Sequence, residues 1–204
     1  MNKRGMKLTD LGCSNSKILK QNHGGRNHWS QGLLESMKDP ELIIKQTESI
    51  VVIRDKYPKA KIHYLVLPRD DIKSIYHLKT EHIDLINEFS SIYEDIRCDI
   101  KNYKLRAGFH AVPSMQRLHM HIISTDMISP CLKTKQHWNS FTTKFFIPHE
   151  DLLQELKNNG FIKRISSENH KSLISTPLVC NQCDYKPKNM PLLKEHLLSH
   201  TKEN

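Results

Sequence analysis

The stretch 113–124 constrains this chain more than any other, because its side chains alternate between two kinds. Leu118, Met120 and Ile122 are apolar, and the positions between and before them hold Arg117, His119 and His121. Successive side chains of a β-strand point to opposite faces, so one face would be buried and the other would carry two imidazoles and a guanidinium. The run just before it adds a third histidine, His110. We expect these side chains to converge on one small ligand.

Three kinds of chemistry are open to these histidines. They could hold a metal ion, because imidazoles two apart on a strand chelate well, although Arg117 on the same face would repel a cation. They could be structural. They could also act on phosphorus: a neutral imidazole attacks an α-phosphate and forms a phosphoramidate, which water then cleaves. Ser114 and Lys133 would donate to the developing phosphate charge, so this third interpretation is favoured.

The surrounding pattern predicts an α+β fold, an antiparallel sheet with helices on one side. Three further strands are expected, each rich in β-branched or apolar residues, at 50–53, 61–67 and 105–111. The segment 71–79 is expected to be a loop or a short helix. Apolar residues at helical spacing predict a helix from about Thr80 to Asp99.

Helices are also expected at both ends of this domain. Residues 28–39 form a predicted short helix that ends before Pro40, and residues 149–159 form another, with Gly160 as its cap. Residues 125–147 are interpreted as a loop followed by an aromatic-rich strand or edge.

Length and charge bound the possible partners. The chain has 204 residues and a net charge of +9, and a basic chain of this kind favours polyanions, of which nucleic acid is the commonest. Five scattered cysteines argue against a disulfide framework. No apolar run approaches the roughly 18 residues that span a bilayer, and no secretory signal is visible. We therefore expect an intracellular protein without a membrane partner.

Four parts are expected along the chain. Residues 1–26 hold six basic side chains and one acid, and are interpreted as a mostly disordered basic arm. A catalytic domain with an N-terminal helix follows at 27–161, then a polar linker at 162–177, and last a small metal-binding module at 178–204.

The last module has the spacing of a C2H2 zinc finger, Cys-x2-Cys-x12-His-x3-His. Tetrahedral Zn²⁺ takes two thiolates from a tight turn and two imidazoles from one helix face. The predicted ligands of this structural zinc are Cys180, Cys183, His196 and His200. Leu193 falls where such a finger places the core residue of its helix.

This finger is poorly suited to reading a base sequence. The three helix positions that contact bases in such fingers are held by Asn189, Leu192 and Glu195, of which leucine offers no hydrogen bond and glutamate repels phosphate. We expect contact that is independent of sequence, through the phosphate attraction of Lys186, Lys188 and Lys194. A purely structural or protein-binding finger is the alternative.

Several motifs resemble a known family. The run 117–123 resembles the histidine-triad motif His-φ-His-φ-His-φ-φ, with Arg117 in place of the first histidine. Within that superfamily the chain resembles the aprataxin family, over about residues 27–200, including the order of catalytic domain and finger. The motifs that carry this closer resemblance are His28-Trp29-Ser30-Gln31-Gly32-Leu33, Asp55-Lys56-Tyr57-Pro58-Lys59-Ala60, Gly108-Phe109-His110-Ala111-Val112-Pro113-Ser114-Met115, Ser129-Pro130-Cys131-Leu132-Lys133 and His137-Trp138-Asn139-Ser140-Phe141.

The resemblance implies a nuclear DNA deadenylase of strand-break repair. It implies removal of AMP from 5′-adenylated DNA, the product of abortive ligation, and also from adenylated RNA–DNA junctions. His119 would be the nucleophile and form an adenylyl-histidine, His110 would assist the leaving group, and His121 would contact phosphate. The implied substrate-binding residues are Asp55, Lys59, His63, Ser114, Met115, Arg117 and Lys133. The implied cofactor is the structural zinc alone, with none needed for catalysis.

The resemblance also bears on DNA contact and on recruitment. Trp29, which alone would be interpreted as a hydrophobic anchor, becomes a wedge that stacks on the terminal base pair beside Ser30; such stacking does not depend on sequence. The forkhead-associated domain of longer family members is absent from this sequence, so we expect no phosphopeptide scaffold as partner. The alternatives are a hydrolase of adenosine phosphoramidates or dinucleotides, and a non-catalytic zinc-finger DNA-binding protein.

Overall fold

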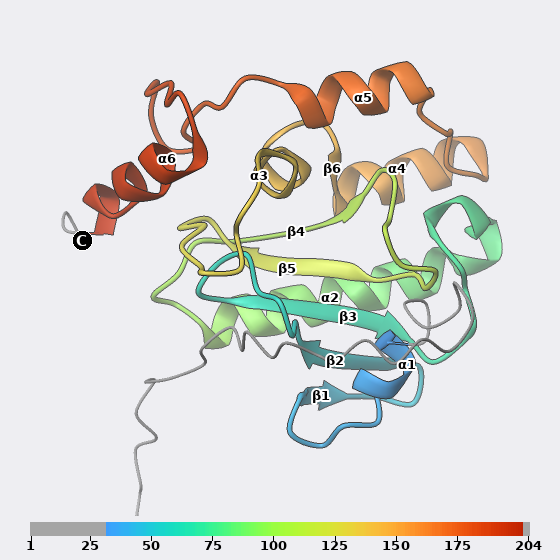
Figure 1. Ribbon diagram of the computed structural model, residues 1–204. Coiled ribbons are helices and arrows are strands. Elements are labelled where there is room, and N and C mark those ends of the chain that lie inside the picture. Colours follow the sequence, from blue (N-terminus) through green and yellow to red (C-terminus); the bar gives the residue numbers. More distant parts are fainter. Residues whose placement is uncertain (1–31, 202–204) are drawn as a thin grey trace, which may run out of the picture.

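The computed structural model describes residues 32–201, so the expected arm at 1–26, Trp29 and Ser30 lie outside the described residues. A six-stranded sheet in the order β1-β2-β3-β5-β4-β6 forms the centre of the molecule (Figure 1). Every pairing in it is antiparallel. The strands are β1 Ile43–Gln46, β2 Ile50–Arg54, β3 His63–Pro68, β4 Leu105–His110, β5 Met120–Ser124 and β6 Phe146–Pro148. The predicted α+β fold with an antiparallel sheet is confirmed.

The central strands are apolar on both sides because both faces of the sheet are covered. Along β2, Ile50 and Val52 join one hydrophobic cluster, whereas Val51 and Ile53 join another on the opposite face. All four side chains are at most 1% exposed. A continuous β-branched run therefore suits this position better than an alternating one.

Two helices cover one face of the sheet. Helix α2, Ile83–Asp99, follows the short 3-10 helices η1 Ile75–His77 and η2 Thr80–His82, and helix α4 is His149–Asn159. They bury residues at helical spacing, among them Ile86 and Phe89 of α2 and Leu152 of α4. Gly160 ends α4 with a φ of 76° and donates its N–H to the carbonyl of Leu156 at 2.9 Å, which confirms the expected cap.

The opposite face carries a shorter helix, so helices lie on both sides of the sheet and not on one side as predicted. Helix α1, Gly32–Ser36, packs Leu33 against the cluster that contains Val51 and Leu65. The helix expected at 28–39 ends earlier than predicted, at Ser36, after which the chain turns through bonds from the Lys38 and Asp39 N–H groups to the carbonyls of Glu35 and Ser36.

The segment 125–147 differs from its prediction. It contains helix α3, Lys135–Thr142, and only the three residues of β6 are strand. Thr134 begins the helix by accepting the His137 N–H on its hydroxyl at 3.1 Å. Trp138 and Phe141, three residues apart, are both buried on one side of it. The aromatic content that was interpreted as a strand is the buried face of a helix.

The polar segment 162–177, expected to be a linker, contains helix α5, Ser167–Ser175. Helix α5 lies beside α3 (Figure 1). The Asn139 side chain on α3 donates to the carbonyls of Ile174 and Thr176 at 2.9 and 2.8 Å. The connection between the two modules is thus bonded to the first of them.

The C-terminal module packs against the same region. It consists of helix α6, Met190–Leu197, and the 3-10 helix η3, Ser199–Thr201. Leu193 is fully buried, as predicted, in one cluster with Trp138 and Phe141. The Trp138 indole donates to the Val179 carbonyl at 3.2 Å. Finger and sheet domain therefore share a hydrophobic core. Within 32–201, no helix is long and apolar enough to cross a membrane.

Candidate active site

The strand register gathers three of the predicted histidines on one face of the sheet. His121 on the central strand β5 lies opposite Leu65 on β3 and Gly108 on β4. Cross-strand partners share a face, as do residues two apart on one strand, so His63 and His110 share the face of His121. The ring centroids of His63 and His110 lie 5.2 and 4.3 Å from that of His121.

His119 completes the group immediately before β5. Its ring centroid is 4.9 Å from that of His121, and its side chain is buried. Its Nδ1 lies 2.7 Å from the Arg117 carbonyl oxygen. A carbonyl can only accept, so Nδ1 carries the proton and Nε2 of the neutral ring keeps a free lone pair.

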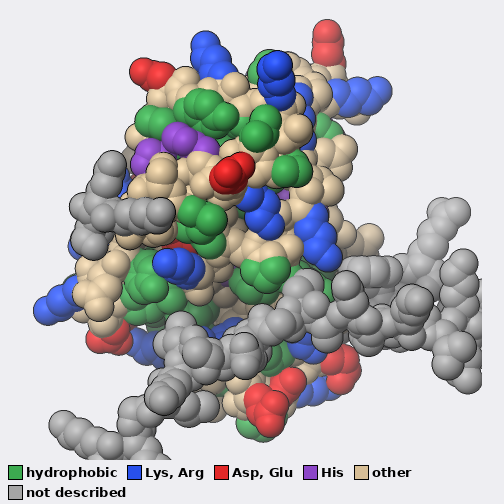
Figure 2. Space-filling model, turned by 60° about the vertical axis from the view of Figure 1, so that its left-hand side comes forward, with side chains coloured by type: hydrophobic (Ala, Val, Ile, Leu, Met, Phe, Trp, Pro, Cys, Tyr) green, Lys and Arg blue, Asp and Glu red, His purple; other side chains and the backbone are tan. Residues whose placement is uncertain are grey.

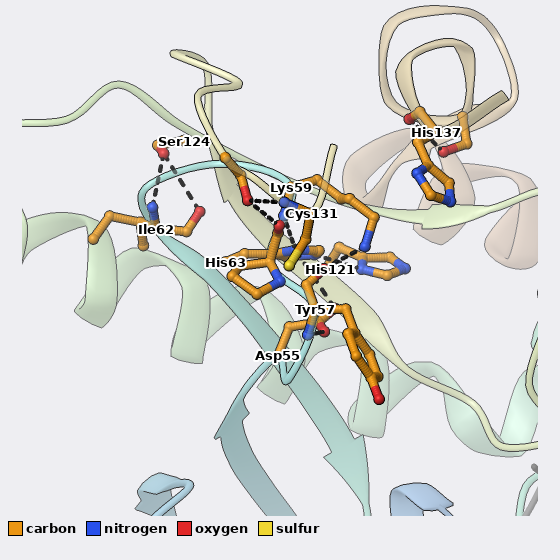
Figure 3. Close-up of polar contacts among 12 residues, drawn as sticks. Asp55, Tyr57, Lys59, Ile62, His63, His121, Ser124, Cys131 and His137 are labelled. Atoms are coloured by element: carbon orange, nitrogen blue, oxygen red, sulfur yellow. Dashed lines mark hydrogen bonds and ion pairs between the residues drawn. The ribbon is translucent and has the colours of Figure 1, made fainter. Parts of the chain in front are cut away.

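A second hydrogen-bond chain fixes the tautomers of His63 and His121. The Lys59 backbone N–H donates to His63 Nδ1 at 3.1 Å. The neutral His63 ring must therefore carry its proton on Nε2, which lies 3.0 Å from His121 Nδ1 and donates to it. His121 is left with its proton on Nε2, a buried atom without a hydrogen-bond partner in 32–201. Figure 3 shows His63 and His121 gathered with Asp55 and Lys59.

Burial keeps these imidazoles neutral. Burial lowers the pKa of His63 to about 4, against the opposing effect of Asp55. It also lowers the pKa of His110 and of His121 well below the usual value, and neighbouring histidines and Lys59 act in the same direction. The pKa of His119 is lowered by burial and partly restored by its bond to the Arg117 carbonyl. At neutral pH the group therefore offers the unprotonated Nε2 of His119 beside the Nε2–H donor of His121.

Arg117 does not offer its guanidinium to a ligand as the alternation suggested. Its Nη2 donates to the carbonyls of Pro68 and Arg69 at 2.8 and 2.9 Å, and its Nη1 lies 3.5 Å from Asp71 Oδ1. The side chain is 4% exposed. The neighbouring backbone rather than a ligand accepts these hydrogen bonds.

The other predicted site residues divide into two groups. Asp55 and Lys59 join the histidines: Asp55 Oδ2 is 3.5 Å from His63 Nδ1, and the Lys59 ammonium donates to the Tyr57 carbonyl. Ser114 and Lys133 are exposed. Met115 is only partly exposed and packs on the cluster that contains Leu33, beside α1.

Two residues of the site were given no role by the sequence interpretation. The ring of Phe141 lies 4.7 Å from that of His110 and 5.2 Å from that of His121. His137 Nδ1 accepts the Lys133 N–H at 3.3 Å, and burial, then Lys59 and Lys133, lower its pKa. Both residues belong to α3, one turn apart. The i, i+4 spacing was the available signal, and it was hidden by interpreting this segment as a strand.

Among residues 32–201, two clusters of side chains have the composition of a metal site. Asp55, His63 and His121 place donor atoms within 4.8 Å of one another. Both nitrogens of His63 are engaged, one accepting and one donating, so no lone pair of His63 remains for a cation. The arrangement is a hydrogen-bond chain rather than a metal site.

The second cluster, at the C-terminus, fits Zn²⁺. Donor atoms of Cys180, Cys183, His196 and His200 lie within 4.8 Å of one another. Separations of 3.2 Å between Cys183 Sγ and His196 Nε2, and of 3.5 Å between Cys180 Sγ and His200 Nε2, suit a tetrahedron with Zn–S about 2.3 Å and Zn–N about 2.0 Å. His200 comes from η3 and not from the helix of His196, unlike the single helix face that was predicted.

Comparisons with known proteins match both modules. Residues 28–137 match the family described as "Scavenger mRNA decapping enzyme C-term binding", and residues 142–203 match the "C2HE / C2H2 / C2HC zinc-binding finger". The second match begins within α3, in keeping with the core that α3 shares with the finger.

Relatives are similar over most of this chain. An aprataxin of Ciona intestinalis is 45% identical over 83% of this chain and 45% of its own length. An aprataxin-like protein of Saccharomyces cerevisiae is 33% identical over 83% of this chain and 94% of its own. The chain thus spans about half or less of the length of several animal relatives.

A solved structure has the same fold. The crystal structure of the aprataxin ortholog Hnt3 in complex with DNA has a TM-score of 0.67 and 27% identity over 83% of this chain and 92% of its own. The chain belongs to the aprataxin family of histidine-triad proteins with a C-terminal zinc finger.

Proposed function

We propose that this protein is a DNA deadenylase, which hydrolyses 5′-adenylated DNA to AMP and 5′-phosphate DNA. The observation that carries the proposal is the 2.7 Å bond between His119 Nδ1 and the Arg117 carbonyl, since it leaves Nε2 as a nucleophile. Nε2 attacks the α-phosphorus, the 5′-phosphate of the DNA leaves, and the new P–N bond is an adenylyl-histidine. Water then cleaves that bond and releases AMP.

The neighbouring imidazoles supply hydrogen bonds to the phosphate. His121 carries its proton on Nε2, which donates to a non-bridging oxygen as negative charge develops there. Nε2 of His110 also has no hydrogen-bond partner in the described range, and His110 assists the leaving DNA phosphate. Neutral donors suit this role because they stabilise the phosphate without trapping the product as an ion pair.

The remaining contacts follow the rim of the site. Asp55, Lys59 and His63 line the adenosine and ribose side. The positive charge of Lys59 lies close enough to His63, His110 and His121 to lower the pKa of each. Ser114, Met115 and Lys133 contact the substrate from the loops before and after β5. Arg117 acts on the substrate only through the backbone that it holds.

DNA binds outside this pocket. Trp29 and Ser30 form the wedge, and Lys186, Lys188 and Lys194 attract phosphates without reading bases. Support comes from the net charge of +9 and from Hnt3, a relative solved in complex with DNA. Figure 2 shows lysine and arginine side chains scattered over one face rather than gathered in a stripe. Lys194 is half-buried and contributes least.

The cellular role follows from the chemistry. The protein acts in the nucleus on adenylated nicks, and on RNA–DNA junctions that carry the same 5′-adenylate. The Zn²⁺ in the finger is structural, because four protein ligands leave no open position for substrate, and the histidine chemistry needs no other cofactor.

The alternative is a hydrolase of free adenosine phosphoramidates or dinucleotides. It is tested by comparing kcat/KM for a 5′-adenylated nick, diadenosine polyphosphate and an adenosine phosphoramidate. We expect the nick to be preferred by about a hundredfold or more, since wedge and finger contacts exist only with DNA. Equal or greater kcat/KM for the free nucleotides would overturn the proposal. A chain that binds nicks with no turnover of any substrate would instead indicate a non-catalytic binder.

A further inference from the structure

We propose that Arg117 is a positioning residue for His119: its guanidinium anchors the one backbone carbonyl that fixes the His119 tautomer. This inference rests on the proposed role of His119 as nucleophile. The inference gives a function to the arginine that stands in place of the first triad histidine. That function is not a ligand contact, because Nη2 of the guanidinium bonds to backbone carbonyls of the protein itself.

The sheet alone does not hold the segment that contains Arg117. Strands β3 and β5 pair in register up to Val66 and Met120, where β5 begins. Continued further, that register would place Arg117 opposite Arg69. Instead the ladder stops before it reaches the carbonyls of Pro68 and Arg69, which lie at the end of β3 and just beyond it. Both accept from Nη2 of Arg117.

Two contacts hold the critical carbonyl from either side. On one side, the Arg117 side chain is bonded to Pro68 and Arg69. On the other, the N–H of Leu118, the amide that follows the Arg117 carbonyl, donates to the Ile72 carbonyl at 2.7 Å. The carbonyl between these anchors accepts from His119 Nδ1. Without the side-chain anchor this peptide is held by the Leu118 bond alone, so the carbonyl can tilt away and the His119 proton is then less confined to Nδ1.

The contacts of Arg69 and Asp71 show which bonds of Arg117 hold its side chain in place. Arg69 is itself held on its other side, since its N–H donates to the Ser49 carbonyl at 2.7 Å. The two acceptors of Arg117 are therefore fixed points of the fold. Asp71, at 3.5 Å from Nη1, has a side chain that is 80% exposed. A long contact to an exposed carboxylate contributes little, so the two carbonyl bonds carry the effect.

Arg117→Met tests the anchor, because methionine retains much of the side-chain length and lacks donors. Leaving the Pro68 and Arg69 carbonyls without this donor costs about 1–3 kcal/mol of stability, so both measurements are made on variants that urea unfolding shows to be folded. Arg117→Lys keeps a donor for one carbonyl and serves as partial rescue. Asp71→Asn is the matched control, since it removes the exposed charge and leaves both carbonyl bonds.

The first measurement needs no substrate. Histidine-¹⁵N-labelled full-length protein is examined by NMR, and the His119 signals are identified by their loss in His119→Ala. We expect a protonated Nδ1 and an unprotonated Nε2 in the parent and in Asp71→Asn, and a mixture of tautomers in Arg117→Met. An unchanged His119 spectrum in folded Arg117→Met would overturn the inference, whether or not the protein acts on adenylated DNA.

The second measurement is single-turnover AMP release from an adenylated nick. We expect Arg117→Met to be slower by about tenfold or more, with nick affinity unchanged and partial recovery in Arg117→Lys. A rate equal to that of the parent would contradict the inference. If the parent itself releases no AMP, the proposed function fails, and the NMR result still decides the role of Arg117.

Discussion

His63 Nε2 lies 3.0 Å from His121 Nδ1 and donates its proton to it, because the backbone N–H of Lys59 already occupies the other nitrogen of His63. A backbone amide in the turn after β2 thereby sets which nitrogen of His121 carries a proton on β5. The direction of this chain makes His121 a donor toward the site, and it depends on His63 remaining neutral.

Removing the donor from His63 should impair the reaction more than binding. We expect His63→Leu to slow single-turnover AMP release by about tenfold or more, because His121 is then free to adopt the other tautomer. His63→Gln places an amide N–H near the former Nε2 and should recover part of the rate. His82→Leu, at the start of α2 and away from the site, is the control. Equal rates in His63→Leu and His63→Gln would exclude the donor role.

The lowered pKa values predict a loss of stability in mild acid. The unfolded chain takes up protons near the ordinary histidine pKa of 6.5, whereas buried His63 does so only near 4. The free energy of unfolding is therefore complete above 6.5 and falls as the pH drops toward 4, by about 3 kcal/mol for His63 alone. Urea unfolding at several pH values measures this.

A matched variant isolates the contribution of His63 to the pH dependence of the free energy of unfolding. His63→Gln has no proton to take up at this position, so its urea midpoint should fall less steeply between about pH 6.5 and about pH 5. Loss of zinc in acid affects both proteins equally and cancels in the difference. Parallel pH profiles would show that His63 is not responsible.

Gly108 on β4 pairs with Pro148 on β6 on one side and with His121 on β5 on the other. A Cβ at this position would meet the Ile147 carbonyl oxygen, and atoms of the Phe146 ring at 2.8 and 2.9 Å. We expect Gly108→Ala to lower the free energy of unfolding by about 1–3 kcal/mol, as β6 is pushed away. Gly32→Ala is the control, since a Cβ there meets nothing within 4 Å. Chemical denaturation measures the free energy of unfolding of both variants, and an equal value for Gly108→Ala and Gly32→Ala would contradict the prediction.

Zinc removal should affect the sheet domain as well as the finger. Trp138 on α3 shares a cluster with Leu193 and bonds to the Val179 carbonyl, so the finger covers the helix that supplies Phe141 to the histidines. In a Trp29→Phe background Trp138 is the one remaining tryptophan. We expect a chelator to shift its fluorescence to the red and to lower Tm by about 4 °C or more.

Cysteine variants give the control for this experiment. Cys183→Ser removes a predicted zinc ligand and should reproduce the effect of the chelator, whereas Cys98→Ser, at an exposed position on α2, should not. Unchanged Trp138 emission after complete zinc removal would mean that the finger does not support α3.

Periodicity predicted the parts of the fold that are built from one repeated local pattern. The β-branched run at Ile50 identifies a strand that is buried on both faces, and the helical spacing along α2 identifies a helix that buries one face. The zinc ligands were found because Cys–Cys and His–His spacings are set by one ion. In α3 the sequence signal was ambiguous, since Trp138 and Phe141 are aromatic residues that favour strands as well as buried helix faces.

The tautomers of the site could not be predicted from sequence. They depend on the Lys59 amide and the Arg117 carbonyl, backbone groups whose positions arise only when distant segments meet. The direction of the Arg117 side chain is another such case. Strand alternation suggested that Arg117 contacts a ligand. It carried no information on where β5 begins, which is after Arg117, or on which carbonyls the guanidinium would reach.

The central claim is that His119 becomes covalently attached to AMP. The direct measurement is rapid quenching of the protein with an adenylated nick that carries ³²P in the AMP, followed by mapping of the label by mass spectrometry. The account predicts an acid-labile label on His119 that forms and decays as 5′-phosphate DNA and then AMP appear, and no label in His119→Ala. Label on another residue, or AMP release at an undiminished rate by His119→Ala, would contradict it.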